Sequence, residues 1–72
     1  MEYFVIESVI EIIKARPEDA HAVIVTKSGV VTNAYSLDAY LGKVVFNNEF
    51  TEHITIPFEN IKIIGIAPNE KH

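Results

Sequence analysis

The chain has 72 residues, of which 49% are hydrophobic, three are Gly, three are Pro and none is Cys. This length predicts a single domain with one core, residues 1–72, because domains span roughly 50 to 250 residues. The absence of Cys excludes disulfides, thiol nucleophiles and Cys-based zinc sites. The formal net charge is -4 and the six basic residues are dispersed, which argues against nucleic acid as a partner, since phosphate backbones bind clustered Lys and Arg.

We expect neither a targeting signal at the N-terminus nor a membrane span in this sequence. It begins Met1-Glu2-Tyr3-Phe4, which is acidic, and no small-residue cleavage site follows an apolar run. A membrane span needs about 18 consecutive apolar residues, and charged or polar residues interrupt every apolar run long before that length. We therefore expect a cytoplasmic protein without a membrane partner.

Two periodicities compete in residues 3–15 and predict different elements. On helical spacing the apolar residues form one broad stripe, while Glu7, Glu11 and Lys14 fall on the other side. Six β-branched residues oppose a helix, because such side chains lose rotamer freedom there. We predict an α-helix, with a long first strand as the alternative. The stripe consists of Tyr3, Ile6, Ile10 and Ile13, widened by Val5, Val9 and Ile12.

The segment after Pro17 has the pattern of a β-hairpin. Pro17 ends the helix, because it disfavours helical geometry at the preceding residue. Residues 20–26 then alternate between two faces, and a second extended run covers residues 30–35. Gly29 lies between the two runs and is the expected positive-φ residue of the turn.

Residues 36–42 have the local features of one helical turn. Ser36 can cap its start and Gly42 can close it, which would direct Leu37, Tyr40 and Leu41 toward the sheet. A second hairpin is predicted from residues 44–46 and 52–56, whose polar loop tolerates left-handed geometry at either Asn.

The last predicted strand covers residues 61–67. Strict alternation places Ile61 and Ile63 on one face and Ile64 and Ile66 on the other. Residues 68–72 are expected to be a frayed C-terminal tail.

These elements predict an α+β domain in which an N-terminal helix packs on a small, strongly curved antiparallel sheet of four or five strands. The order of one helix and five short strands, with the segment Ile54-Thr55-Ile56-Pro57-Phe58-Glu59-Asn60-Ile61, resembles Sm-like and SH3-like small barrels. The Asp- and Asn-rich RNA-pocket positions and the Arg-Gly step of Sm proteins are absent from this sequence, so no functional residue is carried over from the resemblance.

No catalytic, cofactor or metal signature is found in the sequence. His21 and His53 lie on predicted strands close to Asp19 and Glu52, which supplies the residue types of a two-His, one-carboxylate metal site. Exposed strand histidines are common, and we expect these two to be solvated or hydrogen-bonded instead. The serines lack a nucleophile motif and the acidic residues are scattered, so we predict no enzyme activity, no cofactor and no bound metal.

The apolar surface that one small sheet cannot cover points to a binding or assembly module acting through protein-protein contacts. We expect a homo-oligomer, with a two-fold dimer favoured, formed through the helix face or by joining strand edges. A further protein partner of unknown kind is also expected. The alternative is a nucleic-acid-binding small barrel, in which Lys27, Lys43 and Lys62 would converge beside Tyr35 or Tyr40. The interface candidates are Val5, Val9, Ile12, Tyr35, Tyr40, Phe50, Ile64 and Ile66.

Overall fold

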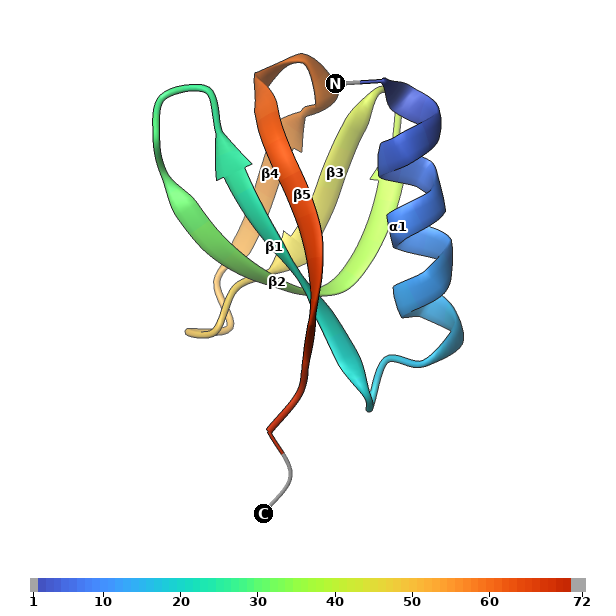
Figure 1. The fold of residues 1–72 in the computed structure, drawn as a ribbon. Coiled ribbons are helices and arrows are strands. Elements are labelled where there is room, and N and C mark those ends of the chain that lie inside the picture. Colours follow the sequence, from blue (N-terminus) through green and yellow to red (C-terminus); the bar gives the residue numbers. More distant parts are fainter. Residues whose placement is uncertain (1, 71–72) are drawn as a thin grey trace.

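A computed structural model describes residues 2–70 and contains one α-helix and one five-stranded antiparallel sheet (Figure 1). The elements in chain order are α1 (Tyr3–Ala15), β1 (Ala20–Thr26), β2 (Val31–Tyr40), β3 (Lys43–Asn47), β4 (His53–Pro57), the 3-10 helix η1 (Phe58–Asn60) and β5 (Ile61–Pro68). The predicted α+β class is confirmed. Among residues 2–70, no helix combines the length and the hydropathy needed to cross a membrane.

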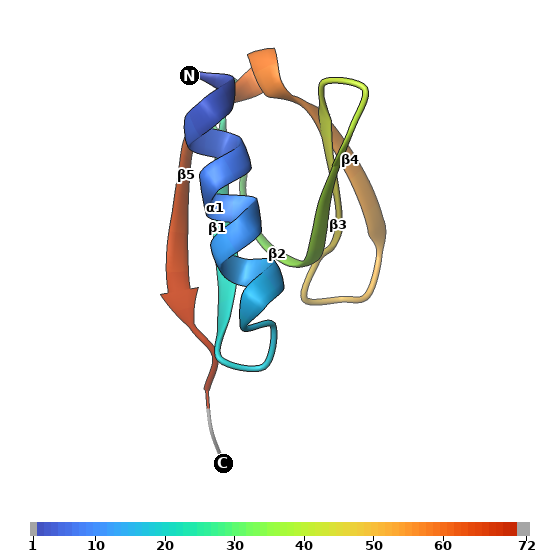
Figure 2. The same ribbon diagram turned by 90° about the vertical axis from the view of Figure 1, so that its right-hand side faces the viewer.

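The helical reading of the N-terminal segment is confirmed, and burial explains why it prevails over the β-branched composition. Ile6, Ile10 and Ile13 are almost completely buried, and each fully buried Ile side chain contributes about 1.5–3 kcal/mol. The helix propensity cost of a β-branched residue is at most about 0.7 kcal/mol. Figure 2 shows α1 lying against the part of the sheet formed by β1, β2 and β5, the strands that it contacts most.

The sheet has the strand order β4-β3-β2-β1-β5. Strands β1 to β4 are neighbours in the sheet in their chain order, joined by three successive hairpins, and β5 pairs with the other side of β1. The sheet bends but does not close, so β4 and β5 are its two free edges. The sheet is therefore open, whereas a small barrel would have no free edge.

The core lies between α1 and the concave face of the sheet. Val9, Ile54 and Ile56 pack against its margin. Its buried hydrophobic members are Ile6, Ile10, Ile13, Ala22, Ile24, Ala34, Leu37, Val44, Phe46, Phe58, Ile61 and Ile64.

The predicted helical turn at residues 36–42 is wrong, because β2 continues through this segment to Tyr40. Tyr35 pairs with Asn47 and Asp38 pairs with Val45, so β2 has one residue more than β3 between these pairs. Ser36 has a φ of 54° at this bulge; it bends the strand and does not cap a helix. Pairing with the next strand, β3, outweighs the helical signals of the segment taken alone.

Both hairpins that the sequence predicts are present, and each uses positive φ in its loop. Gly29 has a φ of 91°, as expected for the turn between β1 and β2. In the loop between β3 and β4 the left-handed residue is Thr51, with a φ of 63°, and neither predicted Asn has a positive φ. The Asn48 side chain instead accepts hydrogen bonds from the backbone N–H groups of Phe50 and Glu52 at 3.0 and 2.9 Å.

The predicted assignment of the β5 side chains to two faces is also wrong at its start. Thr26 pairs with Ile61 and Val25 pairs with Ile63, so Lys62 is an extra residue in a bulge. A bulge of one residue reverses the alternation. Ile61 therefore shares the buried face with Ile64, and Ile63 lies on the opposite face.

The segment predicted to fray begins inside β5, which extends to Pro68. The backbone N–H of Asn69 donates to the Asp19 carbonyl at 2.9 Å, and its side chain donates to the Pro17 carbonyl at 3.1 Å. Residue 69 is thus anchored to the loop between α1 and β1. Residues 71 and 72 lie outside the described part of the chain.

Candidate interaction surface

One flank of α1 is apolar and faces the free edge of the sheet. Lys14 Nζ lies 3.3 Å from Asp38 Oδ1, which orients the opposite flank of the helix toward β2. At 100° per residue, Val5 and Ile12 lie about 160–180° around the helix from Lys14. Because α1 spans β2, β1 and β5 in that order, this apolar flank lies on the β5 side. Val9 lies between the flank and the core and is partly buried.

Strand β5 adds apolar side chains on both faces of the sheet edge. Ile64 and Ile66 pair with Ile24 and Ala22, which are completely buried under α1, so both project to the helix side. Ile64 is 8% exposed and closes the core, whereas Ile66 is 46% exposed. On the other face, Ile63 is 52% exposed.

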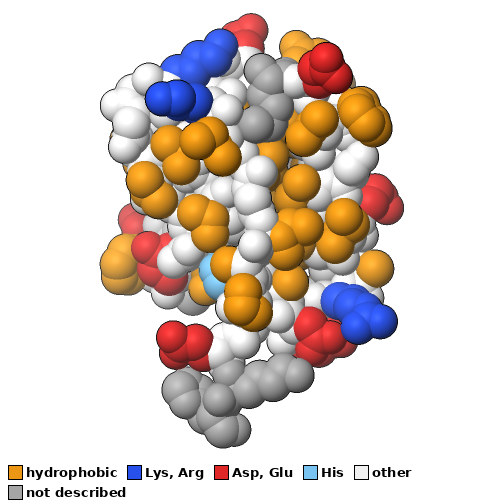
Figure 3. All heavy atoms as spheres, viewed as in Figure 1, with side chains coloured by type: hydrophobic (Ala, Val, Ile, Leu, Met, Phe, Trp, Pro, Cys, Tyr) orange, Lys and Arg blue, Asp and Glu red, His pale blue; other side chains and the backbone are white. Residues whose placement is uncertain are grey.

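We call this surface the β5 rim. It consists of the free backbone edge of β5 together with Val5, Val9, Ile12, Ile63, Ile64 and Ile66. Residues 63–67 of this edge contain no charge, and a charged residue is the usual protection of an edge strand against pairing with another chain. Figure 3 shows hydrophobic side chains spread over β1, β2 and β5, with charged side chains mainly at the margins of this face.

Five of the eight predicted interface residues meet at the β5 rim, namely Val5, Val9, Ile12, Ile64 and Ile66. Ile64 is a core residue at the border of the rim, because α1 and β1 cover it. Ile63 was missed by the sequence prediction, since the bulge at Lys62 that exposes it has no local signature.

The three aromatic candidates lie outside the rim. Tyr35 stacks on His21 with the ring centroids 4.7 Å apart and is half-buried. Tyr40 is exposed at the end of β2, and Phe50 is exposed in the loop between β3 and β4. The structure therefore does not join them to the apolar helix flank.

The two strand histidines do not meet. His21 is on β1 and His53 is on β4, and two strands separate these elements in the sheet. His21 Nδ1 lies 2.7 Å from Asn69 Oδ1, and His53 Nδ1 lies 2.9 Å from Asn47 Oδ1. Within residues 2–70, no three His, Asp or Glu side chains are grouped so that they could hold a metal ion.

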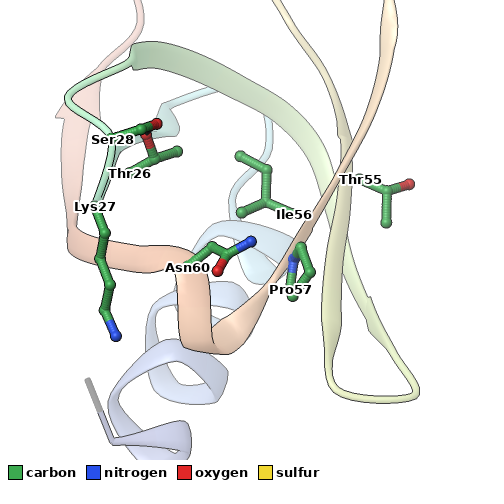
Figure 4. A pocket seen from close by; sticks show the side chains of 7 residues that line it. All are labelled: Thr26, Lys27, Ser28, Thr55, Ile56, Pro57 and Asn60. Atoms are coloured by element: carbon green, nitrogen blue, oxygen red, sulfur yellow. Dashed lines mark hydrogen bonds between the residues drawn. The ribbon is translucent and has the colours of Figure 1, made fainter.

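A groove of about 530 Å³ lies between the turn after β1 and the end of β4 (Figure 4). Thr26, Lys27 and Ser28 line one side, and the Lys27 backbone N–H donates to the Asn60 carbonyl at 2.8 Å. The other side is formed by β4 from Thr55 to Pro57. Lys27 is the only charged residue among the groove-lining residues that the structure describes.

Three lysines lie around η1, at the same end of the molecule as this groove. Lys27 bonds to Asn60 through its backbone, Lys62 follows Asn60 by two residues, and Lys43 pairs with Pro57. The exposed Tyr40 pairs with Lys43 in the sheet. The topology thus brings these three lysines to one end of the molecule, where the acidic Glu59 of η1 lies among them.

Asp38, whose ion pair with Lys14 orients α1, has a carboxyl group with a lowered pKa. The pKa of Asp38 is lowered, first by a hydrogen bond from the Ala39 backbone N–H at 2.8 Å and then by Lys14. Both groups favour the charged form of the carboxylate. Both side chains of this pair are exposed, so it orients the helix more than it stabilises the fold.

Comparisons of the chain with protein-family models, with curated proteins and with solved structures found no match.

Proposed function

We propose that this protein is a non-enzymatic binding and assembly module that associates with itself through the β5 rim. The observation that carries the proposal is the coincidence of three features on one side of the molecule: an unpaired strand edge, exposed isoleucines on both faces of that strand, and an apolar helix flank. Each feature alone is common on protein surfaces. Their combination is typical of a surface that another chain covers.

The proposal is tested by sedimentation velocity on the wild-type protein and two matched variants. We expect the wild type to sediment with twice the chain mass of 8.1 kDa. Ile63→Asp introduces a charge on the rim at an exposed position, so it should give a folded monomer. Phe50→Asp is the control, since Phe50 is exposed away from the rim, and it should leave the dimer intact.

Two results would contradict the proposal. One is a wild-type protein that remains monomeric up to about 1 mM, a concentration at which even weak specific association is visible. The other is an Ile63→Asp variant that associates as strongly as the wild type. Circular dichroism of each variant shows whether it is folded, so that a loss of association is not mistaken for a loss of structure.

A second candidate function, binding of single-stranded nucleic acid, is favoured by one observation. Lys27, Lys43 and Lys62 surround η1, and Tyr40 is exposed beside Lys43, which supplies cations for phosphates and a ring for base stacking. The net charge of -4 opposes it. Fluorescence anisotropy with a labelled single-stranded RNA decides: tight binding that weakens with added salt and is lost in Lys43→Glu supports this candidate, and no binding at low salt eliminates it.

A further inference from the structure

We propose that two copies of the chain join through their β5 strands, antiparallel, about a two-fold axis that passes by Gly65. This inference rests on the proposed function and specifies its geometry. It turns two five-stranded sheets into one continuous sheet of ten strands and places both copies of α1 on the same face of that sheet.

Gly65 is the first observation that locates the axis. It lies in the middle of the exposed part of β5, where a glycine weakens a strand. Its φ is outside the left-handed region, and a Cβ added to it would meet no atom within 4 Å. Neither backbone conformation nor packing within this chain therefore requires glycine here. Gly65 is the midpoint of the uncharged stretch formed by residues 63–67, so a two-fold axis at Gly65 pairs this apolar stretch with its own copy.

The side chains around Gly65 complement themselves when Gly65 is placed opposite Gly65 of the second copy. On the outer face, the large Ile63 then faces the small Ala67 of the other chain. On the helix face, Ile64 faces Ile66, so that the exposed Ile66 is covered by a residue of the same shape. Because the register is two-fold symmetric, each of these apolar contacts occurs twice.

The two helices then flank a shared apolar channel. Three strand spacings of about 4.8 Å separate the two β1 strands in the joined sheet, which places the helices about 14 Å apart. Directly packed helices lie about 8–10 Å apart. The difference leaves room for side chains from both chains, and Val5, Val9 and Ile12 supply them above the Ile64 and Ile66 pairs.

The area of the β5 rim is sufficient for a specific dimer. The eight residues of β5 span about 26 Å at about 3.3 Å per residue. The sheet and the helix packed on it are together about 20 Å thick, so the side of the molecule along β5 is a surface about 26 Å long and about 20 Å high. Contact between two such surfaces buries about 1,000 Å² in total, which is the lower limit for a specific interface.

Charge also favours this register. With Gly65 on the axis, Lys62 lies opposite Pro68 of the second copy and diagonally across from its Glu70. Both charged residues are exposed, and diagonal neighbours are about 7–8 Å apart, within reach of long side chains. The uncharged stretch of the edge is thus bounded at each end by one opposite-charge pair.

The other free edge is less suited to pairing. Strand β4 is shorter, with five residues, and it carries the polar His53 and Thr55 on its outer face. Both strands end in a proline, Pro57 in β4 and Pro68 in β5, so the terminal proline does not distinguish the two edges. The choice of β5 rather than β4 is the part of the proposal that the following experiment tests.

The chain contains no Cys, so single cysteines report the register directly. In Gly65→Cys, the two introduced residues would face each other with Cα atoms about 4.5–5.5 Å apart, within the range of a disulfide. Oxidation with glutathione should link this variant quantitatively into a covalent dimer. The matched control is Thr55→Cys on the β4 edge, which should remain unlinked. Ile63→Cys mixed with Ala67→Cys should give linked heterodimers.

The outcomes separate the geometry from the proposed function. If the wild type is dimeric by sedimentation but Gly65→Cys stays unlinked, the two-fold geometry is overturned while self-association stands. Disulfides between Gly65→Cys and Thr55→Cys in a mixture would show head-to-tail joining of β5 to β4 and would also overturn it. If the wild type is a monomer, both proposals fail. A final check is charge reversal: Lys62→Glu should weaken the dimer severalfold, and the double variant with Glu70→Lys should restore it.

Discussion

Truncation of Ile24 to alanine tests whether the core lies where the fold places it. Ile24 is at the centre of β1, paired with Thr32 on β2 and with Ile64 on β5. Its side chain is completely buried beneath α1. Ile24→Ala therefore opens a cavity among three elements whose backbones are held by sheet pairing and can close it only in part.

The expected loss is a large part of the total stability. Truncation of a buried Ile to Ala costs about 2–5 kcal/mol, and full burial places Ile24 in the middle of that range, at about 3–4 kcal/mol. A chain of 72 residues has a free energy of unfolding of about 4–11 kcal/mol. The thermal midpoint should fall by about 12–32 °C, at about 4–8 °C per kcal/mol for a domain of this size.

Urea denaturation followed by circular dichroism measures this loss, with Ile63→Ala as the control. Ile63 has the same side chain on the neighbouring strand but is 52% exposed. At high dilution, Ile63→Ala should cost less than about 1 kcal/mol, and its cost should grow with protein concentration as the rim becomes covered. A loss below about 1 kcal/mol for Ile24→Ala would refute the assigned core.

Three smaller predictions concern single residues. The lowered pKa of Asp38 means that its ionised form stabilises the fold above the ordinary aspartate pKa and that this contribution is lost as the pH falls through the lowered value. Asp38→Asn should thus flatten the acid limb of the urea midpoint plotted against pH. Leu41 has a φ of 51° and is 80% exposed, so Leu41→Asn should raise the free energy of unfolding by about 1 kcal/mol in a thermal melt. Asn69→Ala removes the hydrogen bonds to His21 and Pro17 and should cost about 1–2 kcal/mol, with faster hydrogen exchange at the start of β1.

The sequence predicted the elements whose signals are local. The helix at residues 3–15 follows from the 3.6-residue spacing of its isoleucines, although β-branched composition argues against it. The hairpin around Gly29 follows from two alternating runs that flank a turn residue. In each case the local pattern and the tertiary packing agree, which is why the prediction succeeded.

The failures occur where the pairing of one strand with another decides the structure. Residues 36–42 have a capping serine and a closing glycine, yet β3 draws them into a strand with a bulge at Ser36. The bulge at Lys62 likewise depends on the register of β5 against β1. It determines that Ile63 is exposed, so the rim could be predicted from the sequence only in part, through its helix flank, Ile64 and Ile66.

Hydrogen–deuterium exchange at two protein concentrations tests self-association through the β5 edge most directly. Each free strand edge exposes unpaired backbone N–H groups, and pairing with a second chain protects them. Between about 5 µM and about 500 µM, across which a dimer of moderate affinity assembles, those amides of residues 63–67 that point away from β1 should become protected, while those of β4 remain unchanged. Exchange of residues 63–67 that is independent of concentration, or protection that increases at β4 instead, would contradict the account.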